Sequence, residues 1–202
     1  MSNKLIIQYS SVMEAGVDEA GRGCLAGPVV AAAVILNPRY DWSMMNDSKK
    51  LTSKQRTNLS NYIKQHALAW SIAIVDNMVI DRVNILQATY AAMHQAIEKL
   101  SESPELILVD GNRFKPFKNI PYHCIVKGDS KVASIAAASI LAKTERDLIM
   151  QKLHVKYPVY QWDKNKGYGT ENHRNAILNY GLSPYHRRSF NCFGDGQLKL
   201  EF

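Results

Sequence analysis

The chain has 202 residues, of which 46% are hydrophobic, and a formal net charge of +7. This length suits one large domain or a domain with an appendage, and the longest apolar run is too short to cross a bilayer. A basic chain suits a polyanionic partner such as nucleic acid, although many proteins of similar charge bind none. Three widely spaced cysteines and an amino terminus without the apolar core of a signal peptide predict a cytoplasmic protein without disulfides.

The first predicted elements surround a pair of adjacent acids. An apolar lead-in reaches Asp18 and Glu19, a glycine pair follows at Gly21 and Gly23, and an apolar run occupies residues 29–36. This pattern predicts a strand, a sharp loop and a second strand, with both acids at the rim of a sheet. Adjacent carboxylates repel each other, and a divalent cation relieves that repulsion. The alternative is an acidic turn that faces water.

The remaining predicted elements mix helices and strands along the chain. The predicted helices are at about 53–66, 86–100, 134–154 and 171–180. The predicted strands are at 70–75, 106–109 and 124–126. Residues 162–170 carry charges, aromatics and two glycines, which predicts a loop. We expect a mixed α/β main domain at 1–157 and a helical, loop-rich extension at 158–202.

Two more carboxylates follow later elements. Asp110 comes directly after the apolar strand at 106–109, and ligand sites of α/β sheets gather at such strand ends, although Asp-Gly is also a common turn. Asp129 precedes the long helix and is either a fourth acid of the site or the N-cap of that helix. If the first strand and the 106–109 strand are parallel neighbours, Asp18 and Asp110 meet at one rim. Convergent carboxylates without a histidine or cysteine ligand set favour Mg²⁺ or Mn²⁺.

The adjacency of Asp18 and Glu19 raises a geometric problem. Successive side chains of a strand point to opposite faces, so the two carboxylates cannot both aim at one metal from a regular strand. Either the strand breaks at Glu19, or Glu19 serves partly through its main-chain carbonyl. The nearby glycines allow both options.

Segments spread over nearly the whole chain resemble the ribonuclease HII family. They are residues 16–23 (GVDEAGRG), 27–30 (GPVV), 46–51 (NDSKKL), 110–112 (DGN), 127–130 (KGDS), 134–143 (SIAAASILAK), 166–170 (KGYGT) and 186–190 (HRRSF). They occur in the family's order, and the combination is specific although each segment alone is a weak signal. The resemblance implies an α/β, ribonuclease H-like fold: a five-stranded mixed sheet flanked by helices, with a helical carboxyl-terminal extension.

The resemblance also implies an activity. Enzymes of this family hydrolyse the RNA strand of RNA–DNA hybrids and incise 5′ to single ribonucleotides embedded in duplex DNA, in replication and ribonucleotide repair. The family's catalytic positions fall on Asp18, Glu19, Asp110 and Asp129, which would hold two Mg²⁺ or Mn²⁺ ions and give 3′-hydroxyl and 5′-phosphate ends by in-line displacement. An exonuclease or transposase-like nuclease would not explain the Gly-Arg-Gly turn beside the acids. A non-catalytic hybrid-binding protein would not need four acids.

Similarity to the family assigns further residues to the substrate. Gly21, Arg22 and Gly23 fall on the segment that contacts the ribonucleotide, where glycines let peptide groups approach the 2′-hydroxyl. Tyr168 matches a tyrosine that packs on the sugar at the RNA-to-DNA junction. Candidate phosphate contacts, each of which is otherwise a solvated surface charge, are Ser48, Lys49, Lys143, Lys166, Arg187 and Arg188. His186 is interpreted as substrate-side or structural.

The last six residues, 197–202 (QLKLEF), resemble the peptide by which bacterial replication and repair proteins dock on the sliding clamp. An extended tail would offer Gln197 for hydrogen bonding and Leu198, Leu200 and Phe202 as anchors for an apolar pocket. The alternative is that these side chains fold back onto the domain. The expected partners are therefore RNA–DNA hybrid, ribonucleotide-containing duplex DNA and the clamp, with no membrane, and the expected state is a monomer.

Overall fold

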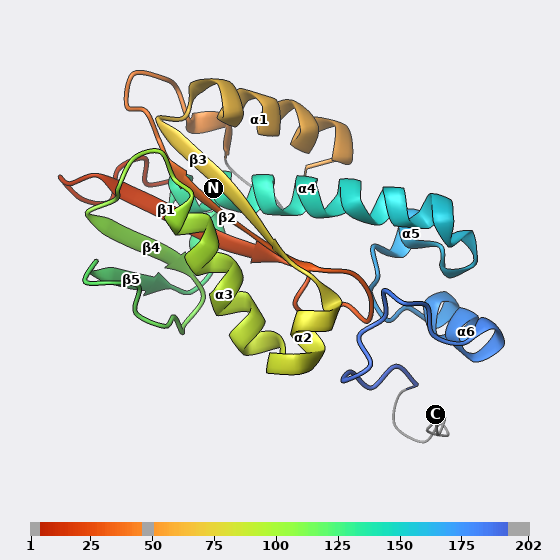
Figure 1. Cartoon of the computed structure of the whole chain (residues 1–202). Coiled ribbons are helices and arrows are strands. Elements are labelled where there is room, and N and C mark those ends of the chain that lie inside the picture. Colours follow the sequence, from red (N-terminus) through yellow and green to blue (C-terminus); the bar gives the residue numbers. More distant parts are fainter. Residues whose placement is uncertain (1–4, 46–50, 194–202) are drawn as a thin grey trace.

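The computed structural model describes residues 5–45 and 51–193 (Figure 1). The strands are β1 (Glu14–Ala20), β2 (Val29–Ile35), β3 (Ala69–Val75), β4 (Leu106–Asp110) and β5 (Tyr122–Ile125). They form one five-stranded sheet in the order β3-β2-β1-β4-β5. The β3-β2-β1 pairings are antiparallel and the β1-β4-β5 pairings are parallel. This arrangement confirms the predicted five-stranded mixed sheet.

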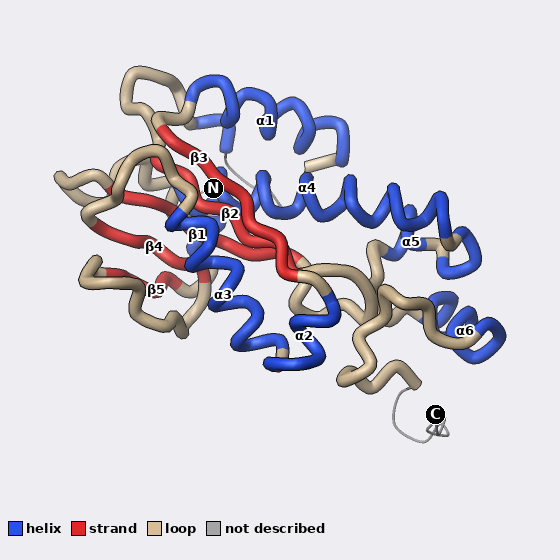
Figure 2. Tube along the Cα trace, viewed as in Figure 1, coloured by secondary structure: helices blue, strands red, loops and turns tan. Residues whose placement is uncertain are grey.

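Helices cover both faces of this sheet (Figure 2). They are α1 (Ser53–His66), α2 (Asn77–Val83), α3 (Ile85–Glu98), α4 (Ala133–Lys156), α5 (Trp162–Asn165) and α6 (Glu171–Tyr180). Helix α4 packs on one face, with α1 beside it, and α3 packs on the other. The sequence did not predict α2 or α5, because helices of seven and four residues are too short to show a helical period.

Helix α4 lies very close to β1 because neither element carries bulk at the contact. Ala136 and Ala137 are fully buried in the core on this face. A Cβ atom on Gly16 would lie 2.1 Å from the carbonyl carbon of Ser134, so only glycine is compatible with this approach. The first half of α4 is therefore fixed against the strand that carries Asp18 and Glu19.

The extension after α4 has a small core of its own. Trp162 is fully buried and stacks on Tyr160, with ring centroids 5.1 Å apart. This core also includes Leu25 and Ala26 of the β1–β2 loop and Met150 of α4. The extension is thus packed on the loop that follows the paired acids, and the division of domains at residue 157 stays a prediction.

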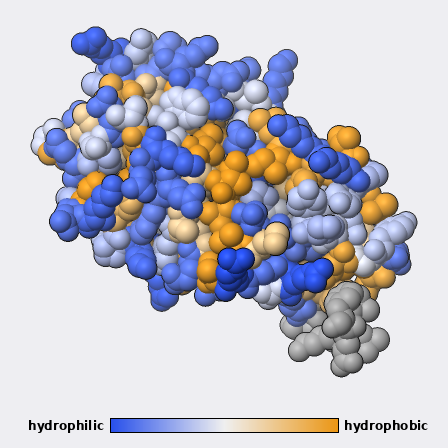
Figure 3. Space-filling model, viewed as in Figure 1, coloured by the Kyte–Doolittle hydropathy of each residue, from blue (hydrophilic) through white to orange (hydrophobic). Residues whose placement is uncertain are grey.

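The face shown in Figure 3 is mostly hydrophilic, and its widest apolar area crosses the middle of the view. Among the large apolar side chains of β3 and α2, Ile74 and Met78 are exposed. Among the helices that the structure describes, none has the length and apolar character needed to span a membrane.

Candidate active site

Asp18 and Asp110 lie at the same rim of the sheet. β1 and β4 are parallel with Val17 opposite Val109, so Asp18 and Asp110 follow at the same level. Asp18 is 4% exposed, and the Asp110 Oδ1 atom accepts a 2.7 Å hydrogen bond from the main-chain N–H of Gly128. The juxtaposition expected from parallel pairing is therefore present.

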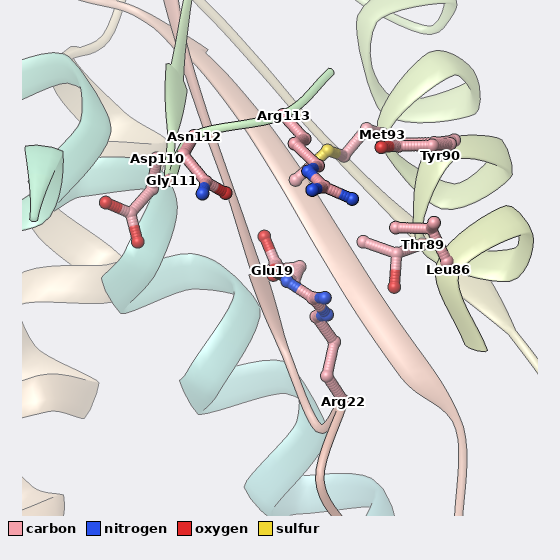
Figure 4. Close-up of a pocket in the computed structure, with 10 residues that line it drawn as sticks. All are labelled: Glu19, Arg22, Leu86, Thr89, Tyr90, Met93, Asp110, Gly111, Asn112 and Arg113. Atoms are coloured by element: carbon pink, nitrogen blue, oxygen red, sulfur yellow. Dashed lines mark hydrogen bonds and ion pairs between the residues drawn. The ribbon is translucent and has the colours of Figure 1, made fainter. Parts of the chain in front are cut away.

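Glu19 points to the opposite face from Asp18. β1 remains paired with β2 through Ala20, so the predicted break of the strand at Glu19 does not occur. The Glu19 side chain lines a cavity of about 330 Å³ beside α3, together with Arg22, Asp110 and Arg113 (Figure 4). The Arg22 Nη1 atom lies 3.1 Å from the Glu19 Oε1 atom, whereas the Glu19 Oε2 atom is buried and has no hydrogen-bond partner among the described residues.

Asp129 is not the N-cap of the long helix. It lies in a 3₁₀ turn at Gly128–Ser130 and is 3% exposed, whereas the residue at the N-cap of α4 is Val132. The Asp129 Oδ2 atom is 3.9 Å from the Nζ atom of Lys143, which also donates a hydrogen bond to Ser139 on α4. The capping alternative is therefore wrong, and Asp129 lies on the α4 side of the sheet.

The acids repel one another in a poorly solvated setting. Burial, together with the charges of Glu19 and Asp110, raises the pKa of Asp18 to about 8, while Lys143 opposes the shift. Burial also raises the pKa of Glu19, against the effect of Arg22. The Lys143 ammonium thus supplies positive charge among the carboxylates.

The donor set fits a hard cation in its chemistry. Every candidate side-chain ligand is a carboxylate, and the Glu19 Oε2 atom, which lacks a hydrogen-bond partner in the described part of the chain, is the kind of buried acceptor that a cation would satisfy. Within residues 5–45 and 51–193, no three or more His, Cys, Asp or Glu side chains are grouped closely enough to hold a metal ion as they stand.

The Gly-Arg-Gly loop lies against the segment that carries Tyr168. The Leu25 N–H donates a 2.8 Å hydrogen bond to the Gly167 carbonyl, and Cys24 forms a bridge pair with Tyr168. Arg22 and Gly23 are exposed, and the Tyr168 side chain is 51% exposed. The fold thus joins two predicted recognition segments that are far apart in the sequence.

Two buried arginines support this loop from below. The Arg187 guanidinium is fully buried and donates to the Gly21 carbonyl at 2.7 Å, the Arg22 carbonyl at 2.8 Å and the Gly27 carbonyl at 3.0 Å. The predicted phosphate contact of Arg187 is therefore wrong, because its donors are committed to the loop and none of its surface is exposed. Burial lowers the pKa of Arg187 to about 10.

Arg146 is the second of these arginines, and the sequence interpretation missed it. It donates to the carbonyls of Pro28, Lys166 and Ala26, so it ties the loop to the extension. Gly21 has a φ of +97°, and a Cβ atom there would lie 2.0 Å from the Arg146 Nε atom. The helical spacing of Arg146 from Ala142 and Met150, which are both buried, places it on the buried face of α4, so the sequence pattern did indicate its burial.

A basic cavity of about 360 Å³ lies beside the loop. Its lining includes Gly21, Arg56, Lys143, Arg146, Lys164, Lys166 and Tyr168. Arg56 of α1 was also missed, and it pairs with Asp147 at 2.9 Å. Of the other predicted phosphate contacts, Arg188 is exposed but does not line this cavity.

Six predicted site residues lie outside the described part of the chain. They are Ser48, Lys49 and the tail residues Gln197, Leu198, Leu200 and Phe202.

Comparison with known proteins identifies the family. A model of the family described as Ribonuclease HII matches residues 15–193. The chain belongs to the ribonuclease HII family. A ribonuclease HII from Bacteroides thetaiotaomicron is 55% identical over 191 residues, covering 95% of this chain and 96% of the relative. One from Cytophaga hutchinsonii is 56% identical over 189 residues, covering 93% of each.

Solved structures agree with this family and its fold. Ribonuclease H2 from Pyrococcus horikoshii has a TM-score of 0.74 at 27% identity and covers 89% of this chain and 94% of its own. Archaeoglobus fulgidus ribonuclease HII, solved in complex with PCNA, has a TM-score of 0.78 at 25% identity, covering 93% and 98%. A Bst ribonuclease HIII in complex with Mn²⁺ has a TM-score of 0.74 at 19% identity and covers 92% of this chain and 69% of its own. The chain is therefore a ribonuclease H with a ribonuclease H-like fold.

Proposed function

We propose that this ribonuclease HII binds two Mg²⁺ or Mn²⁺ ions through Asp18, Glu19, Asp110 and Asp129. The observation that carries the proposal is that Asp18 and Asp110 follow paired positions of two parallel strands at one rim of the sheet. Burial and neighbouring charge there raise the pKa of Asp18 to about 8. Such a concentration of poorly solvated negative charge is tolerated when cations neutralise it. The Mn²⁺ complex of the similarly folded ribonuclease HIII is compatible with this assignment.

The two ions would activate a water molecule and stabilise the leaving oxygen of an in-line displacement, giving 3′-hydroxyl and 5′-phosphate ends. The side chains of the chain then have separate roles. Asp18 and Asp110 anchor ions on the α4 side of the rim, and Asp129 completes that side. Because β1 runs unbroken past Glu19, we propose that Glu19 contributes to metal binding partly through its main-chain carbonyl. Lys143 limits the repulsion among the acids when they carry full charge.

Recognition of the ribonucleotide is assigned to the loop and to Tyr168. Peptide groups of Gly21–Gly23 would contact the 2′-hydroxyl, the group that separates RNA from DNA at a single position. The half-exposed Tyr168 ring would pack on the neighbouring sugar at the RNA-to-DNA junction. The cavity lined by Arg56, Lys143 and Lys166 would take backbone phosphates, with Ser48, Lys49 and Arg188 as further contacts.

Tyr168→Ala tests the recognition assignment. It should lower kcat/KM for a single embedded ribonucleotide by about 5- to 150-fold, because ring stacking contributes about 1–3 kcal/mol. Tyr168→Phe should keep most of the activity, since stacking does not need the hydroxyl group. Tyr180→Ala is the matched control, because Tyr180 is 64% exposed on α6 and outside both cavities near the acids. Equal losses of activity and thermal stability in Tyr168→Ala would instead indicate a packing role.

We also propose that residues 197–202 bind the sliding clamp. Support comes from the QLKLEF sequence and from the archaeal ribonuclease HII that was solved in complex with PCNA. Deleting residues 197–202 should leave cleavage of short oligonucleotides unchanged and abolish capture of the enzyme on immobilised bacterial clamp. Equal capture of the full-length and truncated chains would contradict the proposal. We further propose that the enzyme acts as a cytoplasmic monomer.

A further inference from the structure

A chain of buried imidazoles runs through the extension to the main chain of Tyr168. His173 of α6 is fully buried, and its Nδ1 atom lies 2.8 Å from the Tyr168 carbonyl oxygen. Its Nε2 atom lies 3.1 Å from the Nε2 atom of His186, which is 1% exposed. At the far end, the His186 Nδ1 atom accepts a 2.9 Å hydrogen bond from the Ser183 N–H.

The partners at the two ends determine the tautomer of each ring. A carbonyl only accepts, so the Nδ1 atom of His173 carries its proton, and its Nε2 atom accepts from the Trp162 indole N–H at 3.0 Å. The Ser183 N–H only donates, so the Nδ1 atom of His186 is bare, and its Nε2–H shares the single lone pair of the His173 Nε2 atom with the Trp162 N–H. A proton added to either ring would face an N–H donor. Burial accordingly lowers the pKa of both histidines, that of His186 to about 3.

This hydrogen-bonded pair of histidines, called the relay below, connects the Gly21–Gly23 loop with the segment that carries Tyr168. The residue after His186 is Arg187, which holds the Gly21 and Arg22 carbonyls. His186 itself forms a bridge pair with Ala26 in the same loop. One end of the relay therefore supports the Gly-Arg-Gly loop, and the other fixes the peptide that carries Tyr168.

We propose that His173 is a positioning residue for ribonucleotide specificity, which sets the place of Tyr168 relative to the Gly21–Gly23 loop through the Nδ1–H bond to the Tyr168 carbonyl. The inference rests on the proposed role of Tyr168 at the RNA-to-DNA junction. A uniform RNA–DNA hybrid offers no junction, so the relay matters more for an embedded ribonucleotide than for a hybrid. The informative quantity is the ratio of kcat/KM on these two substrates.

Two substitutions separate positioning from packing. His173→Asn places an amide N–H where the Nδ1–H stood, so it keeps the bond to Tyr168 and leaves the Trp162 and His186 donors unpaired. His173→Gln places an amide oxygen near the Nε2 position, so it keeps those two donors satisfied and loses the bond to Tyr168. The first variant should be less stable and the second less specific. A purely structural role would make the specificity ratio follow stability.

The experiment measures that ratio and the thermal stability of His173→Asn, His173→Gln and Tyr168→Ala. Tyr160→Phe is the control, because it removes a 2.9 Å bond to the Gly181 carbonyl within the same core without touching the Tyr168 peptide. His173→Gln should lower the ratio about 5- to 10-fold, part of the effect of removing the ring, whereas His173→Asn and Tyr160→Phe should leave it unchanged. A ratio that falls in Tyr168→Ala but not in His173→Gln would overturn the inference and leave the role of Tyr168 intact. No change in Tyr168→Ala would instead reject the role of Tyr168 and the inference with it.

NMR of the wild-type enzyme gives a test that does not depend on variants. Long-range ¹H–¹⁵N spectra should show the ring proton on Nδ1 of His173 and on Nε2 of His186. The opposite tautomers would overturn the inference.

Discussion

Asp18→Asn and Asp110→Asn should each lower turnover of an RNA–DNA hybrid by at least about 1,000-fold at saturating Mg²⁺. In the proposed two-ion site, each change would remove one anionic ligand from the ions that stabilise the transition state, a loss of several kcal/mol, and about 1.4 kcal/mol corresponds to tenfold in rate. Hybrid binding should survive or tighten, because a charge that repels the phosphates is gone. Single-turnover kinetics and filter binding measure the two quantities, and near wild-type turnover in either variant would refute the assignment.

Stability of the metal-free enzyme supplies a second readout for Asp18. Its folded-state pKa is about 8, against an ordinary value of 3.8. Between these pH values the unfolded chain loses a proton that the folded chain retains, so the free energy of unfolding falls as pH rises through this window. Asp18→Asn cannot ionise, so it should match the wild type near pH 4 and exceed it above pH 8 by an amount up to about 1.4 kcal/mol per pH unit crossed. Urea unfolding in EDTA at pH 5 and pH 8.5 measures the difference, and a variant that is less stable at both pH values would contradict it.

Arg187→Lys should reduce the free energy of unfolding by about 1–3 kcal/mol for each buried carbonyl left without a donor, because a compact ammonium does not reproduce the planar fork that serves the Gly21, Arg22 and Gly27 carbonyls. Activity on an embedded ribonucleotide should fall with it, since the Gly21 and Arg22 carbonyls lose their support. Arg188→Lys is the matched control, with an exposed side chain beside the buried one, and its stability should change by less than about 0.5 kcal/mol. If the Arg187→Lys enzyme had normal stability and a raised KM, the result would contradict this structural role and would support a phosphate contact by Arg187.

The sheet could be predicted because its signals are local. The apolar strands at 29–36 and 106–109 stand out in the sequence, and the acids that follow or end such strands are placed by strand direction alone. Strand alternation also predicted that Asp18 and Glu19 face opposite ways, but two options for Glu19 remained. Pairing through Ala20, which only the folded sheet reveals, excludes the break of the strand.

The supports of the loop could not be predicted from local pattern. Arg187 and Arg188 are adjacent and chemically equal in the sequence, yet one is fully buried and the other exposed. Their difference arises from the packing of the extension on the β1–β2 loop, a contact between segments about 160 positions apart. Because most arginines lie at the protein surface, a buried arginine that donates hydrogen bonds to carbonyls is easily missed. Arg146 could have been found only from its position on the apolar face of its helix.

The most direct measurement uses duplex DNA with one embedded ribonucleotide, labelled at the 5′ end of that strand and incubated with the enzyme and Mg²⁺. The enzyme should make a single incision on the 5′ side of the ribonucleotide, leave a 3′-hydroxyl end that a polymerase can extend, and make no cut in the matched all-DNA duplex or in the presence of EDTA. Degradation from an end, equal cutting of the all-DNA duplex, or retention of the duplex without a cut would contradict this prediction.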